Sequence, residues 1–317
     1  MRVVVTGASG FIGRNVLIRA PREWEIVAVY HRTADLDAFV EAHRLTHVRA
    51  VPCDLMDESA VRRLSEVAGR ADAALYLAAN GDPAASAVRP RWDLEANTIA
   101  LINFLEHCAP DHLAYVSSGA VYDGLVGPVS PASAVAPRLP YAISKFASEQ
   151  YVRFFAERRG VMSSFINVRF FGAYGPHEPV RKITTRWLLA IAAGQREFIV
   201  RGDGRNLIDF MYVDDAVDGL LALVKARGTS ATVDFASGAP VTVNEVADTM
   251  ARELGADVVL RHDGLTEEYI QFRTVDNAMK ERFSVEPTIP FAEGIRRLHA
   301  FLQRGDPAAG SASWSRA

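Results

Sequence analysis

The fold of this chain is decided by the stretch Val3-Val4-Val5-Thr6-Gly7-Ala8-Ser9-Gly10-Phe11-Ile12-Gly13. Its valines predict a short buried strand, and its last apolar residues predict the start of a helix. The glycines between them let the backbone bend sharply and approach a pyrophosphate, whose charge the free N–H groups at the helix N-terminus would stabilise. The first gap is one residue longer than in Gly-x-Gly-x-x-Gly. We therefore predict a phosphate-binding βα turn, in which the dinucleotide contacts are Gly7, Gly10, Phe11, Ile12 and Gly13.

Length and composition narrow the class of protein. The 317 residues allow two domains or one large one, and the 49% hydrophobic and 23% charged content is ordinary for a soluble globular protein. A net charge of -3 without a basic run argues against a nucleic-acid partner. No apolar stretch approaches the roughly 18 residues of a membrane span. Cys53 and Cys108 fit no metal or disulfide spacing, which favours a reducing cytoplasm.

Strand-like and helix-like segments alternate through the first half of the chain. Short buried strands are predicted at residues 3–5, 26–30, 48–51, 73–77, 113–117 and 165–169. Amphipathic helices are predicted between them, for example at residues 59–67 and 94–108. This alternation predicts an α/β fold, a Rossmann-type doubly wound parallel sheet with helices on both faces.

The pattern changes after Gly175-Pro176. A helix near 183–193 and a strand at 197–200 predict a smaller α/β substrate domain over the carboxyl edge of the sheet. We expect a dinucleotide-binding domain at 1–171 with a returning segment at about 209–236, and a substrate domain at 172–208 and 237–304. The small polar tail at 305–317 is expected to be disordered.

A tyrosine and a lysine begin a predicted helix. The segment Pro140-Tyr141-Ala142-Ile143-Ser144-Lys145 opens it, and Gly160 is its expected end. Tyr141 and Lys145 are four residues apart, so they share one face. An ammonium favours a nearby phenolate, so we expect Lys145 to lower the pKa of Tyr141 and prepare it to exchange a proton with a sugar hydroxyl or carbonyl. Taken alone, the pair is also a common solvated pair.

A third candidate catalytic group is a serine hydroxyl at the end of a predicted strand. The segment Val116-Ser117-Ser118-Gly119-Ala120-Val121-Tyr122 follows a predicted buried strand, and ligands bind at strand carboxyl ends in open α/β sheets. A serine there can donate to the substrate oxygen whose charge changes, although two serines can also simply end a strand. With Tyr141 and Lys145 in the same chain, the catalytic interpretation is favoured.

These motifs resemble those of the extended short-chain dehydrogenase/reductase family, the sugar-nucleotide epimerases, dehydratases and reductases, over nearly all of residues 1–300. Four further segments carry the resemblance: Asp54-Leu55, Leu77-Ala78-Ala79, Arg169-Phe170-Phe171-Gly172-Ala173-Tyr174-Gly175-Pro176, and Gly202-Asp203-Gly204 followed by Tyr212-Val213-Asp214-Asp215. Together they are specific for the family and weakly specific for the reaction.

The resemblance implies a role for each motif. Tyr141 would be the acid/base, Lys145 would hold the nicotinamide ribose, and Ser118 would hydrogen-bond the reacting oxygen. Asp54 and Leu55 would flank the adenine. Further implied contacts are Ala78, Ala79 and Asn97 for the cofactor, with Asn97 behind the site, and Asn80 and Gly119 for the substrate. The family also suggests a homodimer through the helices at 94–108 and 141–157, whose apolar faces could equally serve internal packing.

Departures from the family pattern narrow the reaction. Family 4,6-dehydratases carry Asp-Glu directly after the catalytic hydroxyl, where this chain has Gly119 and Ala120. Neither residue can move a proton, which disfavours a dehydratase and, for the same reason, a decarboxylase.

The second predicted strand ends without the carboxylate that usually accepts from the ribose 2′-OH of NAD. It reads Val27-Ala28-Val29-Tyr30-His31-Arg32, and the Arg32 guanidinium suits a 2′-phosphate. Asp35 or Asp37 could fold back, and Arg32 could be a solvated loop residue. NADP(H) is therefore favoured over NAD(H), and no metal is predicted.

Two polar residues that contact the nucleotide diphosphate in the family are replaced here by Gly172 and Ile208. Other cationic side chains would then have to bind the diphosphate. The alternative is that the candidate side chains simply form a charged surface that faces solvent. The candidates are Arg181, Lys182, Arg186, Arg205 and Arg273.

The sequence thus favours an NAD(P)-dependent enzyme acting on a nucleotide sugar, and within that class a reductase of a 4-keto sugar. The alternative is a nucleotide-sugar 4-epimerase with tightly bound NAD. A further alternative is a non-catalytic dinucleotide-binding sensor, which would not need Ser118, Tyr141 and Lys145 together.

Overall fold

A seven-stranded parallel sheet forms the centre of the protein, in the order β12-β7-β5-β4-β1-β2-β3. The computed structural model describes residues 1–32, 35–264 and 271–304. The strands are β1 (Arg2–Thr6), β2 (Glu25–Tyr30), β3 (Val48–Pro52), β4 (Ala73–Tyr76), β5 (His112–Ser118), β7 (Ser164–Phe170) and β12 (Ala231–Phe235). The six predicted strands and the Rossmann-type fold class are confirmed.

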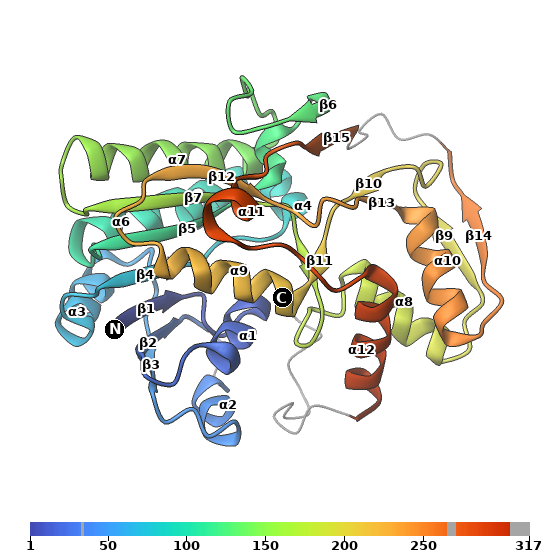
Figure 1. Cartoon of the computed structure of the whole chain (residues 1–317), viewed down its shortest axis with the longest axis horizontal. Helices are drawn as coiled ribbons and strands as arrows, with labels where there is room; N and C mark the ends of the chain where they lie inside the picture. The colour runs from blue at the N-terminus through green and yellow to red at the C-terminus, as the bar shows by residue number, and fades with distance from the viewer. Residues whose placement is uncertain (33–34, 265–270, 305–317) are drawn as a thin grey trace.

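Helices cover both faces of this sheet, as Figure 1 shows. One layer holds α1 (Phe11–Arg19), α2 (Leu36–Ala42) and α9 (Val213–Lys225), and the other holds α3 (Glu58–Ala68), α6 (Ala100–His107) and α7 (Pro140–Glu157). Successive strand residues point to opposite faces, so Val3 and Val5 pack in the first layer and Val4 packs in the second. Burial on both faces explains why the strands read as continuous apolar runs.

A smaller group of elements lies beside the sheet, at the right of Figure 1. Its helices are α8 (Ile183–Ala192), α10 (Val243–Leu254) and α12 (Phe291–Arg304). Its strand pairs are β9 (Glu197–Val200) with β14 (Val259–His262), and β10 (Leu207–Ile208) with β13 (Val241–Thr242). Thr242 and Glu245 form a capping box that starts α10. The predicted helix and strand of this region are both present, whereas the domain boundaries stay a prediction.

Two short strand pairs bring distant segments together near the carboxyl edge of the sheet. The strand β6 (Val126–Val129) pairs with β15 (Gln271–Thr274), and β8 (Ala173–Tyr174) pairs with β11 (Met211–Tyr212). The helix α11 (Ala278–Phe283) follows β15 along the chain.

The helix expected at 94–108 is wrong in its detail. It begins earlier, as α5 (Pro90–Leu94), passes through a π-helical turn (Glu95–Ile99) and continues as α6. The short helix α4 (Pro83–Val88) precedes it. A π-helical turn holds one residue more than an α-helical turn, which a pattern of apolar spacing cannot reveal.

Two other details complete the comparison with the expected elements. The helix α7 ends at Glu157, three residues before Gly160, whose φ of 62° suits glycine. The tail at 305–317 lies outside the described residues, so its predicted disorder stays a prediction.

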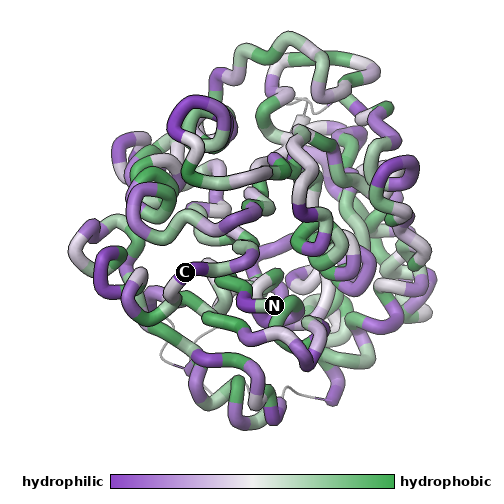
Figure 2. The backbone as a smooth tube through the Cα atoms, turned by 60° about the vertical axis from the view of Figure 1, so that its left-hand side comes forward, coloured by the Kyte–Doolittle hydropathy of each residue, from purple (hydrophilic) through white to green (hydrophobic). Residues whose placement is uncertain are grey.

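Polarity follows this architecture. In Figure 2 hydrophobic stretches run through the interior and hydrophilic stretches gather at outer turns. Within the described residues, no helix combines the length and apolar character needed to cross a membrane. Residues 1–32, 35–264 and 271–304 likewise hold no group of three or more His, Cys, Asp and Glu side chains placed to bind a metal ion.

Candidate active site

The glycine turn is packed too closely for side chains. Thr6 Oγ1 accepts hydrogen bonds of 3.1 Å from the amides of Leu77 and Ala78, which draws the end of β4 against the turn. Gly7 has a φ of 66°, and a Cβ there would lie 2.9 Å from the Ala78 nitrogen. A Cβ on Gly13 would lie 2.4 Å from the Gly7 carbonyl oxygen. Gly7 and Gly13 are therefore required by the turn, and the backbone cradle fits the pyrophosphate of a dinucleotide.

Two cavities adjoin over this turn, with volumes of about 570 Å³ and about 540 Å³. Both are lined by Gly7, Gly10, Leu77, Ala79, Gly81 and Arg181. The larger also contains Phe11, Ile12 and Gly13, so the whole predicted turn faces the cleft. The arrangement fits a nicotinamide dinucleotide laid across the carboxyl edge of the sheet.

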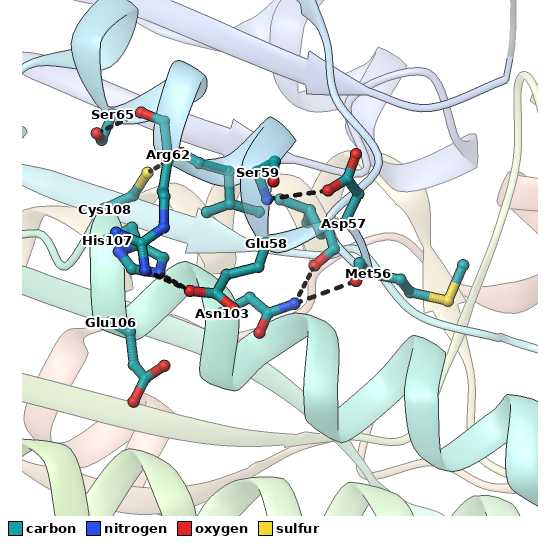
Figure 3. Close-up of polar contacts among 12 residues, drawn as sticks. Met56, Asp57, Glu58, Ser59, Arg62, Ser65, Asn103, Glu106, His107 and Cys108 are labelled. Atoms are coloured by element: carbon teal, nitrogen blue, oxygen red, sulfur yellow. Dashed lines mark hydrogen bonds and ion pairs between the residues drawn. The ribbon is translucent and has the colours of Figure 1, made fainter.

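The smaller cavity holds the residues predicted around the adenosine. Asp54 and Leu55 line it together with Ala78 and Arg32. Asn103 on α6 donates hydrogen bonds to the carbonyls of Leu55 and Met56, at 3.0 and 3.3 Å, as Figure 3 shows. The segment predicted to flank the adenine is therefore held in place by a helix in the layer behind it.

The charges at the end of β2 are arranged in pairs. Asp35 accepts from Arg14 at 2.6 Å, and Asp37 accepts from the Tyr30 hydroxyl at 3.1 Å. The carboxylates that line the smaller cavity among the described residues are Asp54 and Asp82. Neither of the two later aspartates has folded back, and Arg32 is exposed along the cavity wall.

The three predicted catalytic residues line the larger cavity together. Ser118 ends β5, and Tyr141 and Lys145 occupy the first two turns of α7. Lys145 Nζ donates to the Val116 carbonyl at 2.6 Å and lies 4.7 Å from the centre of the Tyr115 ring. Burial lowers the pKa of Lys145 to about 8, although carboxylates nearby oppose this shift.

The expected pKa direction of Tyr141 is wrong. Burial raises the pKa of Tyr141, the negative charge of Asp93 adds to the rise, and a hydrogen bond with Ser118 offsets part of it. The Tyr141 side chain is partly buried in the cavity wall, so the cost of desolvating a phenolate outweighs the attraction expected from Lys145.

The two residues that follow Ser118 in the cavity lining carry no charge. They are Gly119 and Ala120, and a Cβ on Gly119 would already lie 3.1 Å from the Phe171 ring. The charged residues that line the larger cavity, within the described part of the chain, are Lys145, Arg181, Lys182 and Asp209. Burial lowers the pKa of Lys182, and the positive charge of Arg181 adds to the effect.

The other predicted substrate contacts lie elsewhere. Arg186, Arg205 and Arg273 are exposed and outside the lining of both cavities, so their proposed role rests on the sequence alone. Asn80 lines the smaller cavity, and its amide is directed to buried partners. Asn97 is buried behind the site, as the resemblance implied, and its side-chain oxygen accepts from the Asn80 amide nitrogen at 2.7 Å.

A buried ion pair beneath the site was missed from the sequence. Glu149, one turn after Lys145, pairs with Arg169 of β7 at 2.9 Å and accepts from Ser117 at 2.6 Å. Arg169 also donates to the Tyr122 hydroxyl at 3.0 Å, and that hydroxyl donates to Asp234 at 2.7 Å. An arginine inside an apolar strand is the signal that could have revealed this network, because a buried charge needs a partner.

The chain is similar to several known proteins along most of its length. The Probable UDP-glucuronate 4-epimerase of Rhizobium meliloti is 28% identical over 307 residues, which cover 93% of this chain and 86% of that protein. A dTDP-glucose 4,6-dehydratase of Mycobacterium tuberculosis is 28% identical over 228 residues, covering 68% and 66%. The structure of MoeE5 in complex with UDP-glucose and NAD matches with a TM-score of 0.84 and 25% identity, over 96% of this chain and 99% of that one. Residues 3–234 match the NAD dependent epimerase/dehydratase family, and the chain belongs to that family.

Proposed function

We propose that this protein is a nucleotide-sugar 4-epimerase that keeps NAD bound through its catalytic cycle. One observation carries the proposal: Ser118, Tyr141 and Lys145 line a single cavity with the glycine turn, while Gly119 and Ala120 stand beside them without an acid or base. The curated 4-epimerase relative, and MoeE5 with its bound UDP-glucose and NAD, support this assignment over a reductase.

The chemistry needs one proton-transfer group. A bound nicotinamide would accept and return a hydride at the sugar C4. Tyr141 takes the proton of the 4-hydroxyl as that carbon is oxidised and gives it back when the opposite face is reduced. Ser118 donates a hydrogen bond to the same oxygen, and the positive charge of Lys145 on the same helix face stabilises the phenolate.

Elimination of water needs more than this site offers. A 4,6-dehydratase must remove a proton at C5 and protonate the leaving hydroxyl, which calls for a second acid and base. The carboxylate found among the lining residues of the larger cavity is Asp209, which accepts from both the amide and the hydroxyl of Ser237 at 2.7 Å. A single carboxylate cannot supply both the second acid and the second base, so the proposed reaction stops at oxidation and reduction of C4.

A 4-keto sugar reductase is the second candidate, and Arg32 is the observation that favours it. Its guanidinium lies along the adenosine cavity, just past the end of β2, where a 2′-phosphate of NADPH would need a cation. A reductase releases its cofactor after each turnover, whereas an epimerase retains it. The two candidates therefore differ in the nucleotide that stays bound to the protein during purification.

Cofactor content separates them directly. The purified protein is denatured, the released nucleotide is identified by chromatography, and the native protein is assayed with UDP-glucose and UDP-glucuronic acid for the C4 epimer. We expect about one NAD per chain and turnover without added cofactor. Protein free of nucleotide that oxidises NADPH only with a 4-keto sugar would overturn the epimerase assignment.

A further inference from the structure

A fully buried carboxylate stands directly behind the catalytic residues. Asp93, in α5, has 0% exposed surface. Its Oδ1 accepts from the side-chain amides of Asn80 at 2.7 Å and Asn97 at 3.0 Å, and its Oδ2 accepts from the Ser144 hydroxyl at 2.6 Å. These three donors are neutral. A buried charge held by neutral groups is costly to keep, so its retention calls for a physical reason.

The same contacts reach the start of α7. Ser144 lies between Tyr141 and Lys145, and its hydroxyl is also 3.0 Å from the Tyr141 carbonyl oxygen. Asn97 supports that hydroxyl with a hydrogen bond of 2.9 Å. The Tyr141 amide, which has no partner within the helix, donates to the Ser86 hydroxyl at 3.1 Å. The first turn of the catalytic helix is thus fixed by side chains from the segments around Asp93.

We propose that Asp93 is a positioning residue for the reaction: it fixes Tyr141 and Lys145 through Ser144, and it supplies the buried negative charge that balances the positive charge of the catalytic cleft. This inference rests on the proposed function, because it concerns the same tyrosine and lysine.

The charge of Asp93 acts on both catalytic groups in one direction. It raises the pKa of Tyr141, since a phenolate beside a carboxylate is disfavoured, and it raises the pKa of Lys145, since an ammonium is favoured there. Asp93 therefore delays ionisation of the tyrosine and preserves the charge of the lysine.

Other charged groups around this cluster are engaged elsewhere. Glu149 also favours the Lys145 ammonium, but it is paired with Arg169. Tyr115, whose ring lies against Lys145, is held neutral because burial raises its pKa well above the usual value.

On the segment of Asp93 itself, Arg89 stacks on the Trp92 ring with its Cζ 4.3 Å from the ring centre. Glu95 pairs with Arg91 at 2.9 Å, and Asp82, ahead of α4, faces Arg181 at 3.9 Å. Asp93 is thus the carboxylate of this segment whose negative charge acts on Tyr141 and Lys145.

The substitution Asp93→Asn separates charge from shape. Its amide oxygen can keep the position of Oδ1 and accept from Asn80 and Asn97. Its NH₂ group would face Ser144, whose hydroxyl can turn to donate to the Tyr141 carbonyl and accept from the new amide. The hydrogen-bond network survives while the negative charge is removed.

The test is the pH dependence of kcat for C4 epimerisation in wild type and Asp93→Asn. Activity needs Tyr141 as a phenolate and Lys145 as an ammonium, so the two limbs of the profile together report the ionisation of this pair. Removing the carboxylate lowers both pKa values, so we expect both limbs to move to lower pH together. KM for the sugar nucleotide should change by less than about twofold, because the cavity walls are untouched.

Two variants serve as controls. Glu95→Gln removes a charge two residues along the same segment, from an exposed pair, and should leave the profile where it is. Ser144→Ala breaks the network but keeps the Asp93 charge, and should reduce kcat without moving both limbs. If Asp93→Asn reduces kcat with unmoved limbs, as Ser144→Ala does, Asp93 is merely structural and the proposal fails.

Two complications have separate outcomes. Should Asp93→Asn unfold below the assay temperature, Asp93→Ser removes the same charge in a smaller side chain and is held to the same criterion. Failure of the proposed function appears as an inactive wild-type protein, whereas failure of this inference appears as an active wild type whose profile Asp93→Asn does not shift.

Discussion

Replacing Gly13 by alanine tests the argument for the glycine turn most severely. The added Cβ would lie 2.4 Å from the Gly7 carbonyl oxygen, 2.6 Å from the Ala8 carbonyl oxygen and 2.7 Å from the Ala8 carbonyl carbon. All three atoms belong to backbone, so no side chain can move aside. Restoring contacts of about 3.5 Å requires the turn and the start of α1 to separate by about 1 Å.

The expected cost follows from that displacement. Overpacking of this kind destabilises a fold by about 1–3 kcal/mol, which lowers Tm by roughly 2–5 °C in a chain of this size. A shift of about 1 Å would break a hydrogen bond to the charged pyrophosphate, which costs about 1.5–3 kcal/mol and should weaken NAD binding roughly 10–100-fold. Both effects have the same geometric origin.

The assay is calorimetric titration of NAD into protein stripped of its nucleotide, with thermal unfolding in parallel. Gly81→Ala is the matched control: Gly81 lines both cavities, and a Cβ there would have nothing within 4 Å. The reasoning is refuted if Gly13→Ala binds NAD as tightly as Gly81→Ala and unfolds at the same temperature.

Four further predictions concern separate parts of the molecule. Tyr141→Phe should lower kcat by about 10²–10⁴-fold while NAD stays bound, and an unchanged kcat would contradict the role of Tyr141 as the acid/base. Arg181→Ala should raise KM for the sugar nucleotide about tenfold in steady-state assays, whereas the exposed Arg186→Ala should not. Burial raises the pKa of Asp234 to about 6, so its contribution to stability is present at low pH and is lost as pH rises through that value. Urea unfolding at pH 8 and pH 5 should therefore show wild type gaining about 1 kcal/mol relative to Asp234→Asn on acidification. Phe154, which is 46% exposed on α7, is predicted to lie in a homodimer interface, and Phe154→Glu should halve the mass measured by light scattering.

The sequence correctly predicted those elements whose conformation depends on residues that are adjacent in the chain. The turn from Thr6 to Gly13 and the strand that ends at Ser118 were correctly predicted. Both are recognised from consecutive residues, because glycines allow the turn and a run of apolar residues forms the buried strand. The pair Tyr141 and Lys145 was predicted to share a face of a helix, and it does. These elements together specify the carboxyl edge where the cleft opens.

Contacts between distant segments could not be predicted in the same way. Asp93 meets Asn80 and Ser144 from two other elements, and Glu149 meets Arg169 across a helix and a strand. Their partners depend on how layers pack, which residue spacing does not encode. The direction of the Tyr141 pKa failed for the same reason, since burial is a property of the assembled fold.

The π-helical turn Glu95–Ile99 amounts to one residue inserted into an otherwise regular course from Pro90 to His107. A single residue corresponds to about 100° of rotation around a helix axis. Deleting one would swing Asp93 out of the interior or turn the apolar side of α6 toward water. The number of residues in this stretch therefore matters more than their identity. Substitutions at its exposed positions should be tolerated, whereas insertions and deletions should not.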